Sequence, residues 1–147
     1  MFFRGRFQHS MDDKGRVSIP LRFREMLKER RDSRLVITNM TNCLVVYPHE
    51  EWILVEEKVA GLPSVRPDVR SFQRFFISAA TECVPDKQGR ILIPPTLREH
   101  AALEKDVLVV GMQSNFELWA KAKWDDEIRR GQENFDVIAS SLAPLVP

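Results

Sequence analysis

Two short stretches carry the side chains that could do chemistry, and both have the same pattern. Asp12 is followed four positions later by Arg16, and Asp86 is followed at the same spacing by Arg90. Arginine suits the recognition of phosphate or of a guanine edge, because its planar guanidinium can form bidentate hydrogen bonds with either. The aspartate would then brace the arginine. The alternative is a salt bridge that only stabilises a turn.

The paired aspartates also allow a catalytic interpretation, in which two carboxylates share one proton. Two features argue against it. Neither Asp12 nor Asp86 begins the Asp-Thr-Gly or Asp-Ser-Gly turn of aspartic proteases. A neighbouring arginine would also keep each aspartate ionised, which opposes proton sharing. We therefore expect that the chain is not an enzyme.

The two motifs belong to a longer internal repeat. The stretch "DDKGRVSIPLRFRE" spans 12–25, "DKQGRILIPPTLRE" spans 86–99, and half of the 14 paired positions are identical. The similarity continues after a two-residue gap, where Tyr47 and Trp52 match Trp119 and Trp124. Self-similarity of this kind indicates that one supersecondary unit has been duplicated.

Each unit is expected to begin with two strands and a tight turn between them. In the first unit the strands are residues 6–11 and 16–19, and the turn at 12–15 contains Gly15, which supplies the positive φ of a tight connection as Gly89 does in the second. Apolar residues alternate in the returning strands, so they should face one side of the sheet. These residues are Val17, Ile19, Ile91 and Ile93.

A short helix should follow each pair of strands. Pro20 and Pro94 mark the two starts, because proline is tolerated in the first helical turn. In the first helix, Leu21, Phe23 and Leu27 offer apolar contacts while the arginines face outwards. Two short apolar runs complete each unit and predict buried strands. They are "LVIT" with "CLVVYP" and "VLVVG" with "FELWA".

Helices are also expected between and after the units. Residues 50–60 and 122–131 follow the two units, and Val69, Phe72 and Phe76 have the spacing of an amphipathic helix in the connector. Phe72, Phe75 and Phe76 exceed what one helix face can bury, so we expect them at a subunit or repeat contact, with Phe72 more inward than Phe75. The end, "SSLAPLVP", has two prolines and no charge, and predicts disorder.

The predicted fold is mainly β within the α+β class. Two tandem β-β-α-β-β units, residues 5–52 and 81–124, would pair about a pseudo-twofold axis. Residues 53–80 would form a helical connector, and residues 125–147 a C-terminal helix and tail. A single unit leaves open strand edges and cannot close a core, whereas two copies can cover each other.

Composition narrows the function further. The net charge is +1, yet residues 1–34 hold ten Lys/Arg against five acids, which indicates a directed positive field.

No apolar run is long enough for a membrane span or a signal peptide, so we expect a cytoplasmic protein. Cys43 and Cys83 are expected to be buried free thiols. The spacings of His9, His49 and His100 predict no metal site, and no Gly-rich phosphate loop is present, so we expect no cofactor.

The stretch "FRGRFQHSMDDKGRVSIPLRFRE", together with the second "DKQGRILIP", resembles the MraZ family, whose members carry two SpoVT-AbrB-type DNA-binding units in one chain. The resemblance spans nearly the whole chain. It implies a transcriptional regulator that binds repeated short DNA boxes ahead of its own division and cell wall gene cluster. It also implies nucleoid association and assembly of subunits into a ring.

The resemblance also assigns roles to residues. Arg16 and Arg90 would contact DNA from the two loops, with Asp12 and Asp86 positioning them. Lys14 matches the basic loop residue of the family. Its counterpart in the second unit is Gln88, with Lys87 one position earlier, which leaves it open whether the two loops contribute equally. The candidate DNA-binding residues are Arg16, Arg90, Lys14, Asp12, Asp86, Lys87, Gly15, Gly89, Arg4, Arg6 and His9.

A toxin-neutralising or purely structural module on the same scaffold is the alternative function. An antitoxin would normally combine one such unit with a disordered toxin-binding arm. Here the second unit occupies the place of that arm.

The expected DNA is a row of direct repeats, because a ring of subunits arranged head to tail presents all its loops in the same orientation.

Overall fold

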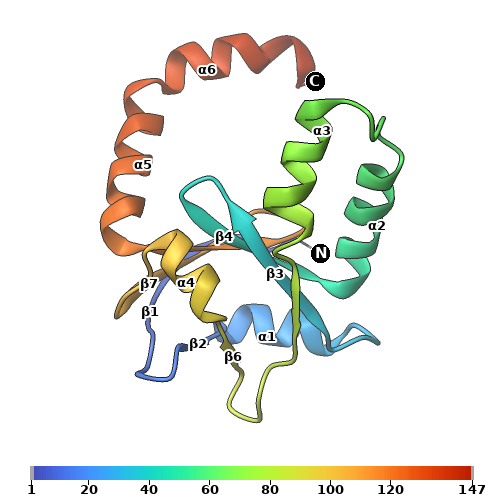
Figure 1. The fold of residues 1–147 in the computed structure, drawn as a ribbon. Helices are drawn as coiled ribbons and strands as arrows, with labels where there is room; N and C mark the ends of the chain where they lie inside the picture. The colour runs from blue at the N-terminus through green and yellow to red at the C-terminus, as the bar shows by residue number, and fades with distance from the viewer. Residues whose placement is uncertain (1, 147) are drawn as a thin grey trace.

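A computed structural model describes residues 2–146 as a β-sheet with helices on both faces (Figure 1). The strands are β1 (Arg6–Ser10), β2 (Arg16–Ser18), β3 (Leu35–Met40), β4 (Cys43–Pro48), β5 (Thr81–Cys83), β6 (Arg90–Leu92), β7 (Asp106–Gly111) and β8 (Phe116–Ala120). The α-helices are α1 (Leu21–Lys28), α2 (His49–Ala60), α3 (Pro67–Phe72), α4 (Pro95–Ala101), α5 (Lys121–Glu133) and α6 (Phe135–Leu142).

The two repeats exchange strands to build one sheet. Six antiparallel strands lie in the order β1-β7-β8-β4-β3-β5, so the first strand of each repeat pairs with the other repeat. Equivalent strands are placed symmetrically about the β4–β8 pair, as the predicted pseudo-twofold arrangement requires. The predicted fold class is confirmed. The pairing explains why one copy of the unit is insufficient, since β1 and β5 each obtain their partner strand from the other copy.

The first two strands of each repeat do not form the expected hairpin. β2 and β6 leave the main sheet and pair with each other in a separate two-stranded ribbon. The two sides of the first turn are linked by the isolated bridge between Met11 and Val17 and by the hydrogen bond from Asp12 N to Arg16 O, at 3.0 Å. The alternation was nevertheless predicted correctly, because Val17 and Ile91 are each 1% exposed and point into the core.

One face of the sheet carries the largest core. It packs against the β2–β6 ribbon and the helices α1 and α4, and includes Phe3, Phe23, Ile93, Leu97 and Phe116. Phe23 is packed between Phe3 and Phe116, with ring centroids 5.1 and 5.3 Å away. The prediction for Leu21 is wrong, because this first residue of α1 is 60% exposed, whereas Leu27 packs against the core.

The opposite face is covered by the connector and α5. Trp52 of α2 and Phe76 pack on Val36 and Val45 of the sheet. On the other half of this face of the sheet, Trp119 packs with Leu108 and Val110 and contacts Trp124. The helices predicted at 50–60 and 122–131 are therefore confirmed as α2 and α5. In Figure 1, α2, α3, α5 and α6 all lie on the side of the sheet away from the β2–β6 ribbon.

The connector helix changes its winding where it meets the sheet. After α3, residues Gln73–Ile77 form a π-helical turn, and the buried Thr38 hydroxyl donates to the Phe76 carbonyl at 2.6 Å. Phe76 is buried, but Phe72 and Phe75 are 43% and 42% exposed. The prediction that Phe72 is more inward than Phe75 is thus wrong. Phe75 instead contacts His100 of the second repeat, with ring centroids 5.3 Å apart.

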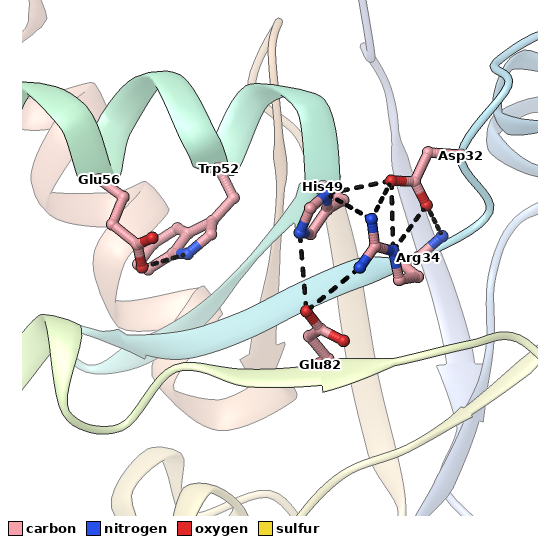
Figure 2. A network of polar contacts seen from close by, with 6 residues as sticks. All are labelled: Asp32, Arg34, His49, Trp52, Glu56 and Glu82. Atoms are coloured by element: carbon pink, nitrogen blue, oxygen red, sulfur yellow. Dashed lines mark hydrogen bonds and ion pairs between the residues drawn. The ribbon is translucent and has the colours of Figure 1, made fainter.

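A polar network fastens β5 to the first repeat (Figure 2). His49, at the start of α2, lies with its Nδ1 3.0 Å from Asp32 Oδ2 and its Nε2 3.6 Å from Glu82 Oε1 of β5. Arg34 contacts both carboxylates, Asp32 at 2.8 Å and Glu82 at 3.7 Å. The hydrogen bonds from Arg34, with the charges of Arg34 and His49, hold the pKa of Asp32 well below its ordinary value. Strand β5 is therefore attached to the first repeat by the contacts of Glu82 with Arg34 and His49 as well as by backbone hydrogen bonds to β3.

The C-terminal region is helical rather than disordered. α6 is followed by a 3-10 turn, Ala143–Leu145, so the prediction of disorder is wrong for all of the tail except Pro147, which lies outside the described residues. Among residues 2–146, no helix is long and apolar enough to cross a bilayer. Cys43 is buried and Cys83 partly buried, both as free thiols. Burial raises the pKa of Cys83 to about 11.

Candidate nucleic-acid interface

The loop before β2 is built around Asp12. The Asp12 Oδ1 atom accepts hydrogen bonds from the backbone N–H groups of Lys14 and Arg16, at 3.0 and 2.9 Å. Its Oδ2 atom accepts a hydrogen bond from Arg16 Nε at 2.7 Å. Gly15 occupies a positive φ of 84°, which permits the tight return. One carboxylate therefore organises both the backbone of the turn and the arginine that follows it.

The loop before β6 repeats this geometry. Asp86 Oδ1 accepts hydrogen bonds from the backbone N–H groups of Gln88 and Arg90, both at 2.9 Å. Asp86 Oδ2 accepts one from Arg90 Nε at 2.9 Å, and Gly89 has a φ of 75°. The two motifs recognised in the sequence are thus two copies of one rigid turn.

The ribbon brings the two turns together. Its register pairs Arg16 with Leu92 and Ser18 with Arg90, on either side of the buried Val17–Ile91 pair. Additional backbone hydrogen bonds join each strand end to the opposite loop, from Ile19 N to Gly89 O at 2.8 Å and from Ile93 N to Gly15 O at 2.9 Å. Figure 1 shows both loops projecting from the same end of the molecule, opposite to α6.

Two arginines that the sequence interpretation left outside the site cover these loops. Arg24 of α1 extends over Gly89, and its Nη1 donates to the Gln88 carbonyl at 3.3 Å. Arg98 of α4 lies over Gly15 in the equivalent way. The prediction that the arginines of the first helix face outwards is therefore wrong for Arg24. A signal was present in the sequence, because both residues belong to the identical positions of the repeat.

Charge at the site favours anion recognition over proton transfer. Hydrogen bonds from the backbone N–H of Arg16 and from its guanidinium lower the pKa of Asp12, and those from Arg90 lower the pKa of Asp86. Both carboxylates are therefore ionised at neutral pH, which opposes a shared-proton dyad. A second ion pair crosses the ribbon, with Arg90 Nη1 3.8 Å from Asp12 Oδ2. The side chains of Arg16 and Arg90 remain 31% and 27% exposed.

The remaining candidate DNA-binding residues lie at different distances from Arg16 and Arg90. Lys14 and Lys87 are exposed in the two loops. His9 is half-buried behind the ribbon near Ser18, and burial, together with the charge of Arg24, lowers its pKa. A neutral His9 offers little attraction to phosphate at pH 7. Arg4 precedes β1 and Arg6 is its first residue, at the end of the strand remote from the loop, and the Arg6 guanidinium lies 5.3 Å from the Trp124 ring centroid.

No group of three or more His, Cys, Asp or Glu side chains in the described part of the chain is arranged to hold a metal ion. Trp52 and Trp119 are also unavailable for stacking on bases, since they are buried under the helices of the far face. Trp124 is partly buried and packs against Trp119 on that face. The site presents two guanidinium groups, each held by a hydrogen bond to its own aspartate, with lysines in the same loops. Such a surface can bind a polyanion that also carries hydrogen-bond acceptors.

Comparison with known proteins gives a consistent result over the whole chain. A family model described as "MraZ protein, putative antitoxin-like" matches twice, at residues 2–75 and 76–143. A protein of Desulforamulus reducens named "Transcriptional regulator MraZ" is 46% identical over 144 residues, which is 98% of this chain and 99% of the relative.

Proteins with the same name occur in Syntrophobacter fumaroxidans, at 47% identity over 97% of this chain and 95% of the relative, and in Pediococcus pentosaceus, at 48% identity over 95% and 96%. All three relatives are named as transcriptional regulators. The two matches of the family model coincide with the internal duplication. The chain therefore belongs to the MraZ family.

Proposed function

We propose that the chain is a transcriptional regulator that binds double-stranded DNA through the β2–β6 ribbon and its two loops. The observation that carries the proposal is the placement of Arg16 and Arg90 diagonally on the outward face of this ribbon, each held by an aspartate. The major groove of B-DNA is wide enough for a two-stranded ribbon. The function in the name of the relatives supports the same assignment.

The aspartates define how the arginines would act. Each carboxylate engages the Nε side of its own arginine, so the far end of the guanidinium can face the groove. In Arg90 the Nη1 atom also lies 3.8 Å from Asp12 Oδ2, and Nη2 is the terminal nitrogen directed away from that ion pair. Two terminal N–H groups can donate to O6 and N7 of one guanine, which is the commonest specific arginine contact in the major groove. Asp12 and Asp86 would be positioning residues, because a carboxylate close to phosphate is repelled.

The lysines would supply phosphate contacts. Lys14 is exposed in the first loop, whereas its counterpart Gln88 is neutral and Lys87 lies one position away. Contacts between lysine and phosphate strengthen binding without reading sequence, and they make the affinity depend on salt. Each loop holds one lysine, so the expectation that the first loop contributes more rests on its basic surroundings, because residues 1–34 hold ten Lys/Arg against five acids.

Two arginine contacts are too few to select a site in a genome, because each is worth only about 1–3 kcal/mol. Several subunits acting together would supply the remainder through effective concentration. Exposed apolar side chains support assembly of this kind. They gather on α3, its π-helical turn and α6, and include Phe72, Phe75, Phe135, Val137, Ile138 and Leu142.

We propose that these residues join subunits into a closed ring, which would present its ribbons in one orientation to direct repeats in DNA. The target would be DNA upstream of the protein's own division and cell wall gene cluster, and the protein would be associated with the nucleoid. A spacing near one helical turn, about 10–10.5 bp, would give every subunit the same groove.

A role confined to toxin neutralisation is less well supported. The second repeat is not a separate arm available to a partner, since β1 pairs with β7 and β5 pairs with β3. Both copies are needed to complete one sheet and one ribbon. The duplication thus serves the DNA-facing end of the molecule.

A mobility-shift titration on the protein's own upstream DNA tests the proposal. Arg16→Ala and Arg90→Ala should each lose about 1–3 kcal/mol of binding free energy per engaged subunit, with unchanged melting temperature and a larger loss for Arg16. Arg129→Ala is the matched control, because this arginine is 64% exposed on α5, far from the loops. If the two loop variants bind as the parent does across a salt titration, the assigned interface is wrong.

The same DNA tests the arrangement of subunits. Affinity should rise steeply from one box to two or three and fall when about five base pairs are inserted between boxes, since half a helical turn moves one box to the far side. Insertion of about ten base pairs should recover part of the affinity. Equal binding to a single box and to every spacing would contradict assembly on direct repeats.

A further inference from the structure

The outward face of the β2–β6 ribbon carries four side chains, and only two of them are arginines. The alternation that buries Val17 and Ile91 turns Arg16, Ser18, Arg90 and Leu92 outwards. Leu92 is 56% exposed, more than either arginine side chain beside it. Within the repeat, Leu92 occupies the position of Ser18, so the two halves of this face differ chemically.

The register determines which of the two loops Leu92 and Ser18 each lie beside. Leu92 pairs with Arg16, next to the loop that holds Lys14. Ser18 pairs with Arg90, next to the loop that holds Gln88. One end therefore combines Leu92 with Lys14, and the other combines Ser18 with Gln88 and the preceding Lys87. The pseudo-twofold symmetry of the backbone does not extend to the chemistry of this face.

An isolated exposed leucine is common on protein surfaces and by itself indicates nothing. Leu92 differs in its surroundings, because it lies on the face that carries both guanidinium groups. Its neighbours Ile91 and Ile93 already fill the core position on either side, at 1% and 0% exposure. Leu92 itself belongs to none of the hydrophobic clusters of the described residues. In the major groove, the apolar group on base edges is the C5-methyl of thymine.

We propose that Leu92 is a specificity-determining residue that contacts the C5-methyl group of one thymine, so that the ribbon recognises an asymmetric site. This inference rests on the proposed DNA-binding function of the ribbon. Residues paired across a ribbon lie about 4.5–5.5 Å apart at Cα. The thymine should therefore lie within about one or two base pairs of the position that Arg16 faces, given a rise of about 3.4 Å per base pair.

Replacing single thymines by deoxyuridine provides a clean test, because the change removes the methyl group and leaves the hydrogen-bonding groups in place. Each thymine of a bound box in the protein's own upstream DNA is replaced in turn, and affinity is measured by mobility shift. For the parent protein, one position per engaged subunit should lose about fourfold in affinity, the contribution of one buried methyl group. The other positions should bind as before.

Two variants connect this effect to the residue. Leu92→Ser copies the residue at the equivalent position of the first repeat, and should bind thymine and deoxyuridine DNA equally at that position. Leu54→Ser is the control, because Leu54 is also an exposed leucine, at 54%, and lies on α2 across the sheet from the ribbon. It should retain the full preference for thymine. Both variants should melt at the temperature of the parent.

The outcomes separate this inference from the function on which it rests. Specific binding by the parent with equal affinity at every deoxyuridine position would overturn the role of Leu92 and leave the DNA-binding function standing. Retention of the thymine preference by Leu92→Ser would also overturn it. Failure of the parent to bind the upstream DNA specifically would overturn the proposed function and this inference together.

Discussion

Substitution of Gly89 by alanine should destabilise the protein because the Arg24 side chain of the other repeat lies directly over this glycine. Gly89 has a φ of 75°, and a Cβ atom there would overlap Arg24 Cδ and lie 2.7 Å from Nη1 and 2.8 Å from Nε. Alanine in the left-handed region costs about 1–2 kcal/mol. Displacing the packed Arg24 side chain adds about 1–2 kcal/mol, within the range for overpacking.

The combined cost of Gly89→Ala is therefore about 2–4 kcal/mol of unfolding free energy. For a chain of this length, that lowers the melting temperature by about 4–16 °C. Urea denaturation and thermal melting measure both quantities. Gly61→Ala is the matched control, because Gly61 has a φ of −79° and an added Cβ would meet only the carbonyls of Lys58 and Glu57, at 3.5 and 3.8 Å. It should change stability by less than about 1 kcal/mol.

A double-mutant cycle with Arg24→Ala isolates the contact between the repeats. In the Arg24→Ala background, Gly89→Ala should cost only the backbone part, about 1–2 kcal/mol, so the two substitutions should be coupled by about 1–2 kcal/mol. If Gly89→Ala is as stable as the parent, or costs the same with and without Arg24, the reasoning that Arg24 covers the second loop is refuted.

Three further predictions concern other parts of the molecule. Asp12→Asn should keep the turn, because Oδ1 can still accept the two backbone hydrogen bonds, but it removes the acceptor for Arg16 Nε. The DNA affinity should therefore fall severalfold at an unchanged melting temperature. An unchanged DNA affinity would exclude the role of Asp12 in positioning Arg16. Phe75→Glu should shift size-exclusion elution towards smaller assemblies without unfolding the chain, since Phe75 is 42% exposed; an unchanged elution volume would exclude this residue from the subunit contact. The lowered pKa of Asp32 means that its contribution to stability is present above its ordinary value of 3.8 and is lost as the pH falls through the lower folded value. The Asp32→Asn variant should therefore unfold at a lower urea concentration than the parent at pH 7, and the two midpoints should converge below about pH 4. A difference between the midpoints that stays constant from pH 7 to pH 3 would contradict the ion-pair network.

Much of the site could be predicted from the sequence because its geometry is local. Asp12 and Arg16 are four residues apart, and a turn with Gly15 at a positive φ is sufficient to bring them into contact. The same holds for Asp86, Gly89 and Arg90. Repetition of the pattern then made the pseudo-twofold relation foreseeable, since two equivalent units with open strand edges can cover each other.

The parts that could not be predicted depend on partners remote in sequence. Periodicity shows which residues of β2 are buried, but it does not identify the strand that pairs with it, so the ribbon between the repeats was missed. Arg24 looked like a solvated residue because its partner, the loop at Gly89, lies 65 positions away. Leu92 appeared to be an ordinary strand residue, and its significance emerged only once the ribbon placed it beside Arg16.

The C-terminal tail forms a helix despite a composition typical of disorder. Two prolines and the absence of charge predicted disorder, yet one proline lies within the first positions of the final 3-10 turn, where its missing N–H is not required. α6 then presents Phe135, Val137 and Ile138 to solvent. Composition alone does not distinguish an unfolded tail from a helix with an exposed apolar face.

The central claim is that Arg16 and Arg90 contact guanines in the major groove from one ribbon. Replacement of single guanines by 7-deazaguanine, which removes only the N7 acceptor, tests this contact directly when combined with Arg16→Ala and Arg90→Ala in mobility-shift titrations. One guanine should lose about tenfold in affinity with the parent and almost nothing with Arg16→Ala, and a different guanine should respond in the same way to Arg90→Ala. If the effect of every 7-deazaguanine is the same for the parent and both variants while specific binding persists, the arginines do not contact guanines and the account is wrong.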